Sequence, residues 1–289
     1  MSRRAVPPVS SDRPREGGAP PTVLAAYFDD CRGEGVHAIA GYMAPLKTWE
    51  ERFSPEWNAI IAAAPHPISE FKAHDCRFRI NEFAGWTRAE CDALTVQLVD
   101  LLTRPEFTDE IYGLGSVVRV PLSENVAERT LAEREALKIG VLCVTTHVLM
   151  LSNPAYPVQV TCDEQPGWQG ALSEIFAFAR EPLANHRSAK ISELVFKDSR
   201  DLAPLQAADL LAYETRKELL NRLEQPPRNR SKALARLIER GRHVAYYVDR
   251  EILSGVTHPH GPLDRPRLLY SDPRMTLPDD LTTVPLRRY

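Results

Sequence analysis

Short apolar runs with strand character alternate along this chain with segments of helical periodicity. The first two runs flank the turn Asp-Cys-Arg-Gly-Glu-Gly, so residues 22–44 predict a β-hairpin. Further strands are predicted at 68–73, 113–122, 158–164 and 191–199. Helices are predicted at 48–60, 87–102, 123–151, 168–178 and from Pro204 onward. Strands that alternate with helices in this way predict a layered α/β fold.

Composition divides the chain into four parts. Residues 1–21 are rich in proline, glycine and arginine and predict a disordered tail. Residues 22–220 carry the alternating pattern and are expected to form the main domain. Residues 221–255 predict a basic helical extension, and residues 256–289 predict a proline-rich tail.

The whole chain of 289 residues has a formal net charge of −3, which neither favours nor excludes a nucleic-acid partner. Its five cysteines form no CxxC pair, which argues against a disulfide framework or a zinc site and favours a reducing compartment. No apolar run is long enough to span a bilayer, and residues 1–21 lack the apolar core of a signal peptide. We therefore expect a cytoplasmic protein without a membrane partner, while the oligomeric state stays open.

Acidic side chains stand at or near the ends of several predicted strands. Asp29 and Asp30 follow the first apolar run, Glu70 lies in Ser-Glu-Phe-Lys, and Asp163 ends the run Val-Gln-Val-Thr-Cys-Asp. A strand end that holds carboxylates gains little stability but is well suited to bind a cation. These positions are therefore candidates for metal ligands.

A further acid lies in the apolar helix that follows Pro204. Gln206, Asp209 and Tyr213 share one face of this helix. A carboxylate in such a helix is costly unless something pairs with it, and hard divalent cations such as Mg²⁺ bind several carboxylates at once. Two such ions about 4 Å apart form the usual apparatus for in-line attack on a phosphodiester.

Taken singly, these acids are also compatible with structural roles. Asp30 fits a turn residue, Asp198 fits a helix cap or a partner of Lys197, and Asp209 fits the partner of a buried arginine. The order of acids on a first strand, a later strand and a late helix is the stronger signal.

The segments around these acids resemble those of the bacterial family called domain of unknown function 3800. Residues 27–33, Tyr-Phe-Asp-Asp-Cys-Arg-Gly, are similar to its opening Tyr-x-Asp-Glu-Ser-Gly. Residues 69–72 are similar to its Glu-x-Lys segment, 161–164 to its middle acidic strand, and 197–213 to its late Asp-Ser…Gln-x-Ala-Asp helix. The resemblance covers residues 23–218. It departs from the family pattern where Asp30 replaces a glutamate and Cys31 replaces a serine.

The resemblance implies a ribonuclease-H-like fold, with a mixed sheet and helices on both of its faces. Such sites use acids from the first strand, a middle strand and a late helix, which by position are Asp29, Glu70, Asp163 and Asp209. We expect Asp29, Asp163 and Asp209 to hold Mg²⁺ or Mn²⁺. Glu70 is expected to complete the metal shell or to position the attacking water.

The predicted function is a divalent-metal-dependent nuclease, or a related phosphoryl-transfer enzyme acting on nucleic acid. Lys72 or Gln206 is expected to orient the substrate or a carboxylate, with Asp30 and Asp198 in supporting positions. Glu70-Phe71-Lys72 also matches half of a restriction-type nuclease motif. In that alternative Lys72 orients the attacking water, and Asp163 and Asp209 lie elsewhere.

The segment 216–250 holds ten lysines and arginines against four acidic residues, an excess of six positive charges. Arg216, Lys217, Arg236 and Arg240 are the candidates for contacts to nucleic-acid phosphates, and a solvated helix face is the equal alternative.

An alternative function from another class is a non-catalytic accessory module of defence systems or mobile elements that binds nucleic acid or protein. Asp30 and Cys31 are what a site without selection for catalysis would contain.

Overall fold

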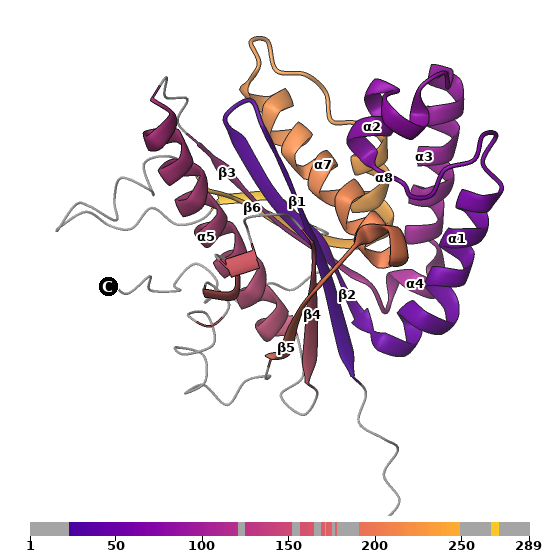
Figure 1. Cartoon of the computed structure of the whole chain (residues 1–289), viewed down its shortest axis with the longest axis horizontal. Coiled ribbons are helices and arrows are strands. Elements are labelled where there is room, and N and C mark those ends of the chain that lie inside the picture. The colour runs from indigo at the N-terminus through magenta and orange to yellow at the C-terminus, as the bar shows by residue number, and fades with distance from the viewer. Residues whose placement is uncertain are drawn as a thin grey trace, which may run out of the picture.

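The computed structural model of this chain describes residues 23–120, 125–151, 157–164, 191–248 and 267–271, with a few helical residues between 169 and 177. The described strands form one mixed sheet in the order β5-β4-β1-β2-β3-β6-β7 (Figure 1). Their bounds are β1 Leu24–Gly33, β2 Val36–Pro45, β3 Tyr112–Arg119, β4 Val158–Asp163, β5 Ile191–Lys197, β6 Arg242–Val248 and β7 Arg267–Ser271.

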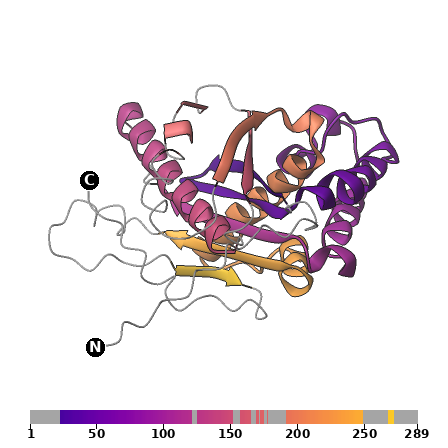
Figure 2. The same cartoon turned by 90° about the horizontal axis from the view of Figure 1, so that it is seen from below.

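The direction of the strands changes along the sheet. β1 and β2 form the predicted hairpin, and β3 continues it antiparallel to β2. β4 runs parallel to β1 and β5 runs parallel to β4, so the ends of these three strands meet at one edge. β6 is parallel to β3, and β7 closes the opposite side antiparallel to β6 (Figure 2).

Helices cover both faces of this sheet, as expected. The described helical segments are η1 Thr48–Phe53, α1 Ser54–Ala62, α2 Ala73–Phe78, η2 Asn81–Phe83, α3 Arg88–Leu102, α4 Pro105–Thr108, α5 Val126–Leu151, η3 Ser199–Asp201, α7 Ala203–Leu223 and α8 Lys232–Arg240. α5 packs against one face, where Leu172 joins the same core, whereas α7 lies on the other face with α1, α3 and α8 (Figure 1). The chain is therefore an α/β protein with helices on both sides of a mixed sheet.

Alternating side chains of β1 and β2 supply the cores on the two faces. Ala26 and Phe28 pack towards α5, and Ala25 and Tyr27 pack towards α7. The α7 side also contains the aromatic series Trp49, Phe53, Trp57 and Phe71, whose rings meet mostly edge to face and which are fully buried or nearly so.

The expected strand at 68–73 is wrong. This segment is extended without a partner strand, and α2 begins at its last residue, Ala73. Its backbone N–H groups donate to side-chain oxygens and not to a neighbouring strand. These bonds join Ser69 to Glu82, Phe71 to Gln206 and Ala73 to Asp209. Side-chain acceptors thus satisfy backbone groups that a strand ladder would otherwise bind.

The expected division at residue 220 also needs correction. α7 continues to Leu223, and beyond its end only α8 is helical in the described part of the segment 221–255. β6 follows α8 and enters the sheet beside β3, and β7, from within the expected proline-rich tail, pairs with β6. The segment is therefore part of the main sheet and not a helical appendage.

Two sequence predictions fall wholly or mostly outside the described residues, namely the tail 1–21 and the segment 256–289. Of the expected helix 168–178, the structure describes residues 169, 170, 172–174 and 177, and these are helical. Among the helices that the structure describes, none combines the length and apolar character needed to cross a membrane.

Candidate active site

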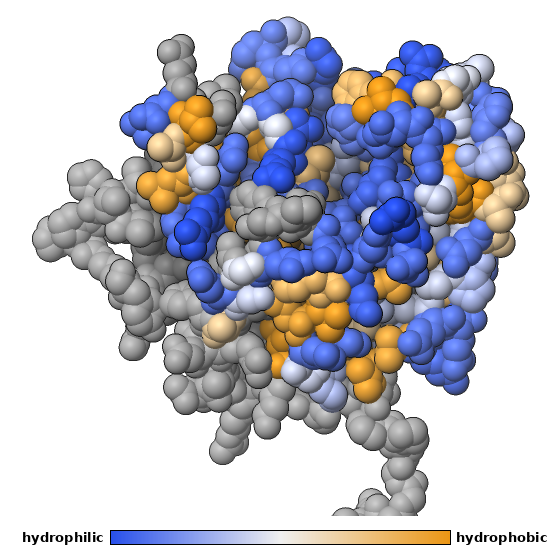
Figure 3. Space-filling view, viewed as in Figure 1, coloured by the Kyte–Doolittle hydropathy of each residue, from blue (hydrophilic) through white to orange (hydrophobic). Residues whose placement is uncertain are grey.

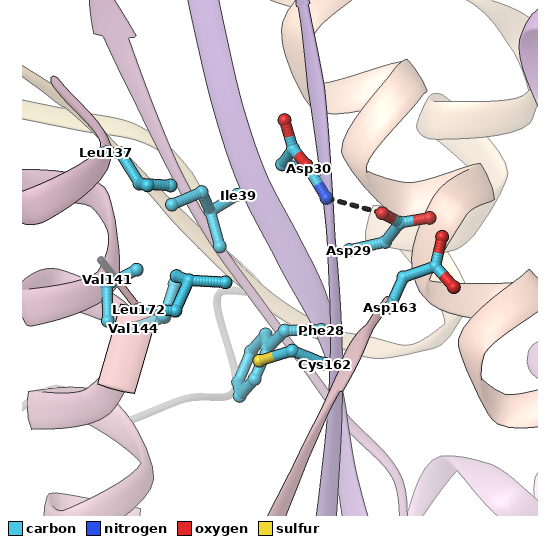
Figure 4. A pocket seen from close by; sticks show the side chains of 10 residues that line it. All are labelled: Phe28, Asp29, Asp30, Ile39, Leu137, Val141, Val144, Cys162, Asp163 and Leu172. Atoms are coloured by element: carbon cyan, nitrogen blue, oxygen red, sulfur yellow. Dashed lines mark hydrogen bonds between the residues drawn. The ribbon is translucent and has the colours of Figure 1, made fainter. Parts of the chain in front are cut away.

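Three aspartates from separate elements face one another on the α7 side of the sheet. Asp29 lies in the middle of β1, directly after the last residue that pairs with β4, and shares the face of Tyr27. Asp163 is the last residue of β4, the parallel neighbour. Figure 4 shows both carboxylates pointing away from a small apolar cavity of about 30 Å³ between these strands and α5. Asp209 approaches from α7, which lies across β1 and β2. The three expected metal ligands therefore converge.

The ammonium group of Lys72 lies among these carboxylates. Its Nζ is 3.2 Å from Oδ2 of Asp163 and 3.7 Å from Oδ2 of Asp29. Asp29 is only 5% exposed and Asp209 only 9% exposed, while the lysine side chain is about one quarter exposed. A protein cation thus compensates part of the buried negative charge, which would otherwise be very costly.

Two side chains of α7 fix the segment that carries Lys72. Oε1 of Gln206 accepts hydrogen bonds from Trp57 Nε1 at 2.9 Å and from the backbone N–H of Phe71 at 3.0 Å. Oδ2 of Asp209 accepts from the backbone N–H of Ala73 at 2.6 Å. The residues on both sides of Lys72 are therefore held by α7. Gln206 thus binds this segment, and of the two residues expected to orient a carboxylate it is Lys72 that contacts Asp29 and Asp163.

Ser199, which the sequence did not single out, joins two of the expected site residues. Its backbone N–H donates to Oδ1 of Asp163 at 3.0 Å, and its hydroxyl donates to Oε2 of Glu70 at 2.8 Å. Its carbonyl oxygen accepts from Nε2 of Gln206 at 3.0 Å. Glu70 is thus connected to the aspartates indirectly, through Ser199, which bonds to Asp163. Ser199 follows Asp198 directly in the sequence, and a role was expected for Asp198 but not for the serine.

The two supporting aspartates have other roles. Asp30 is next to Asp29 in β1, so its side chain points to the opposite face, where Oδ2 lies 3.1 Å from Nε2 of His37 (Figure 4). Asp198 accepts from the backbone N–H of Arg200 at the start of η3 and pairs with that guanidinium. Asp198 is therefore a cap, which was the structural alternative for this residue, and Asp30 lies outside the cluster.

Burial and the repulsion of nearby carboxylates disfavour ionisation of Asp29 and Asp209. The pKa of Asp29 lies well above its ordinary value, chiefly because the group is buried and also because Asp209 and Asp163 are near. Burial likewise raises the pKa of Asp209 to about 6, although Lys72 and the N–H of Ala73 oppose this shift. For Lys72, burial alone would lower the pKa, but the surrounding carboxylates outweigh it and raise the pKa. One ammonium stays charged yet cannot compensate three carboxylates.

The donors fit a hard divalent cation in kind, because carboxylate oxygens are the ligands that Mg²⁺ and Mn²⁺ prefer. The present arrangement of these donors, however, does not form a metal site. Within the described residues, no group of three or more His, Cys, Asp or Glu side chains is placed to hold a metal ion. Lys72 takes up the position between Asp29 and Asp163. A metal would therefore require this ammonium to move aside.

The four expected phosphate contacts divide into one buried residue and three nearer the surface. Arg216 is only 7% exposed, and its guanidinium donates to the carbonyl of Gly33 and to Glu34 in the β1–β2 turn. It stabilises that turn and does not offer its charge to a ligand. Lys217 pairs with Glu214 at 3.4 Å and lies 5.6 Å from the ring centroid of Tyr213.

The other two expected contacts lie on α8. Arg236 pairs with Asp100 of α3 and is one third exposed, and Arg240 is exposed at the end of the helix. Both are closer to solvent than Arg216.

No protein-family model, curated protein or solved structure matches this chain. The resemblance to domain of unknown function 3800 therefore rests on the quoted sequence motifs.

Replacing Gln206 by leucine is expected to destabilise the protein by at least about 3 kcal/mol. The change leaves the Trp57 indole N–H, the Phe71 N–H and the Ser199 carbonyl without their partner, and each such buried group costs about 1–3 kcal/mol. Urea denaturation measures the loss. Gln159→Leu is the control, because that amide bonds only to Glu193 at an exposed position, and it should change stability little. Equal losses in both variants would contradict a bridging role for Gln206.

Replacing Asp209 by asparagine is expected to stabilise the metal-free protein above about pH 6. The folded pKa of Asp209 lies near 6 and the unfolded value near 3.9, so the folded state binds this proton more tightly. The free energy of unfolding then falls as the pH rises from about 4 to about 6, by on the order of 2–3 kcal/mol. Asparagine lacks this titration and still accepts from Ala73.

Denaturation with a chelator present, from pH 2 to pH 8, tests this expectation. Asp198→Asn is the control with the opposite sign, because hydrogen bonds from Arg200 lower the pKa of this exposed carboxyl to about 2. The wild type should therefore lose its advantage over Asp198→Asn as the pH falls towards 2. A constant, pH-independent loss in Asp209→Asn would instead identify Asp209 as one half of a structural ion pair.

Proposed function

We propose that this protein is a divalent-metal-dependent phosphoryl-transfer enzyme, most simply a nuclease, with a ribonuclease-H-like fold. The convergence of Asp29, Asp163 and Asp209 around one compensating lysine carries the proposal. Buried carboxylates with raised pKa values are unfavourable for stability, and such clusters are frequent at catalytic sites. Their origin on the first strand, a parallel neighbouring strand and a late helix supports the fold assignment.

Each residue of the site has a role in this proposal that follows from its contacts. Asp29 and Asp163 project from adjacent parallel strands and would hold the metal together with Asp209, which approaches from α7. Ser199 keeps Asp163 and Glu70 in a fixed relation through two hydrogen bonds. When bound, a divalent ion supplies an activated water and stabilises charge on the phosphoryl group.

Lys72 has two functions in the proposed enzyme. Without metal it compensates part of the carboxylate charge and keeps the site folded. Its side chain is partly exposed and unbranched, so it can swing towards solvent, where its charge would attract a phosphate oxygen of the substrate. The restriction-type alternative expects Asp163 and Asp209 to lie elsewhere, which disagrees with the contact between Asp163 and Lys72.

A second candidate is a non-catalytic module in which Lys72 is the permanent counter-ion of the cluster. The 3.2 Å contact between Lys72 and Asp163 favours it, because this contact already satisfies one carboxylate. This candidate requires that Mn²⁺ neither binds nor stabilises the wild-type protein.

Cleavage of a panel of single- and double-stranded RNA and DNA in Mg²⁺ or Mn²⁺ tests the proposal directly. Thermal unfolding with increasing Mn²⁺ gives an independent reading, because a ligand of the folded state raises the melting temperature with its concentration. Metal-dependent cleavage that Asp29→Asn abolishes and Asp198→Asn leaves intact supports an enzyme. The absence of both cleavage and a Mn²⁺ shift would favour the non-catalytic module.

Asp163→Asn is expected to reduce cleavage far more than Lys72→Met. Loss of a residue one step removed from a metal typically costs about 10–100-fold, so loss of a direct ligand should cost at least that much. Lys72→Met removes a competing cation and should enlarge the Mn²⁺-induced rise in melting temperature. Activity and melting temperature are measured on the same preparations. If Lys72→Met is the more damaging change and Mn²⁺ no longer stabilises it, the metal assignment is wrong.

A further inference from the structure

A cleft of about 670 Å³ lies behind the acidic site, between α2 and α3 on one side and α7 and α8 on the other. Its wall nearest the site contains Ala73, whose backbone N–H is bonded to Asp209, and Tyr213, which is about one helical turn along α7 from Asp209. The cleft and the carboxylate cluster thus share the start of α2 and one stretch of α7. The face where α2, α3 and α7 lie is mostly hydrophilic (Figure 3).

The lining of this cleft is strongly basic. Its charged side chains are Arg77, Arg88, Lys217, Arg228, Lys232 and Arg236 against Asp92 and Glu214. The two acids are already paired, Asp92 with Arg88 at 3.3 Å and Glu214 with Lys217 at 3.4 Å. Two further cations, Arg228 and Arg236, pair with acids outside the lining.

Arg77 and Lys232 both line the cleft, one on α2 and the other at the start of α8. Both side chains are exposed, and within the described part of the chain neither charged group has a carboxylate within 4.0 Å. Like charges that line a cleft lower the energy of an anion there and raise its local concentration. The cleft therefore favours a ligand with several negative charges.

We propose that this cleft binds one strand of nucleic acid through its phosphates and leads that strand to the acidic site. The inference rests on the proposed function and adds the form of the substrate. A volume of about 670 Å³ lies in the range of roughly 300–1,000 Å³ that holds a ligand of drug size, so it admits a few nucleotides of a single strand and not a duplex.

The lining also indicates how the strand is read. Its two aromatic side chains, Phe71 and Tyr213, are buried, and Lys217 lies over the Tyr213 ring. Described residues of the lining thus offer no exposed aromatic face on which a base would stack, in contrast to many proteins that bind single strands. The contacts are to phosphates, so binding depends on salt and little on sequence.

Binding of a short fluorescent single strand to the full-length protein, with a chelator present to prevent cleavage, tests the inference. The strand is expected to bind at least about tenfold more tightly than a duplex of the same length. Log affinity should fall linearly with log salt, with a slope of about −0.7 per phosphate contact. The double variant Arg77→Gln/Lys232→Gln should bind more weakly and flatten this slope by roughly 1.4 if each cation contacts one phosphate.

The matched control is Arg119→Gln/Lys47→Gln, which removes the same charges from exposed positions outside the cleft and should leave the slope unchanged. An unchanged slope in the cleft variant, preferential binding of the duplex, or equal competition by an acidic peptide would each overturn the inference. Failure of the proposed function is seen separately. In that case the single strand binds as expected but no metal-dependent cleavage follows. If the wild type cleaves but the cleft variant binds the single strand as well as the wild type does, the inference about the cleft is wrong and the proposed function stands.

Discussion

The site depends on hydrogen bonds from the backbone of the segment 69–73, which has no strand partner, to side chains of α7. Gln206 and Asp209 accept backbone hydrogen bonds from Phe71 and Ala73, the residues on either side of Lys72. These bonds determine where the ammonium lies, because they fix the backbone from which the lysine side chain extends. Without them the buried carboxylates of β1 and β4 would lack their nearest cation.

Asp209 has two functions that oppose each other. Its carboxylate anchors the start of α2, which stabilises the fold, and it adds negative charge beside Asp29, which raises the pKa of Asp29. An amide would serve the first function without the penalty of the second. The presence of a carboxylate at this position is therefore better explained by affinity for a cation than by stability.

Much of the fold could be predicted because periodicity reports burial directly. The hairpin 24–45, the capped helix α3 and the apolar α7 follow from alternation, a capping box and helical spacing. The segment around Glu70 was misjudged because its extended backbone bonds to side chains more than a hundred residues away in α7, which no local pattern reveals. β6 was missed because the basic residues around it led to the prediction of a solvent-exposed helical extension and not of a strand in the sheet.

The site was predicted in part for the same reason. Asp29 and Asp163 follow the last paired residues of two neighbouring parallel strands, so their meeting follows from the pairing of these strands. Asp30 differs from Asp29 only in the face to which it points, which depends on register and not on composition. Arg216 counted as a basic surface residue, but its position on α7 directs it into the β1–β2 turn. Charge counts along a helix therefore cannot distinguish a ligand contact from a structural one.

The late part of the chain completes the region around the site through the sheet. β6 pairs with β3, and this pairing places α8 beside α3, where Arg236 meets Asp100. α8 then forms one wall of the basic cleft, and α2, whose start is anchored by Asp209, forms part of the other. The same helix, α7, thus separates a negative cluster from a positive cleft by about one turn. A phosphate-bearing strand in the cleft and a cation among the carboxylates would each be stabilised by the charge nearest to it, so the two neighbouring regions are suited to act together.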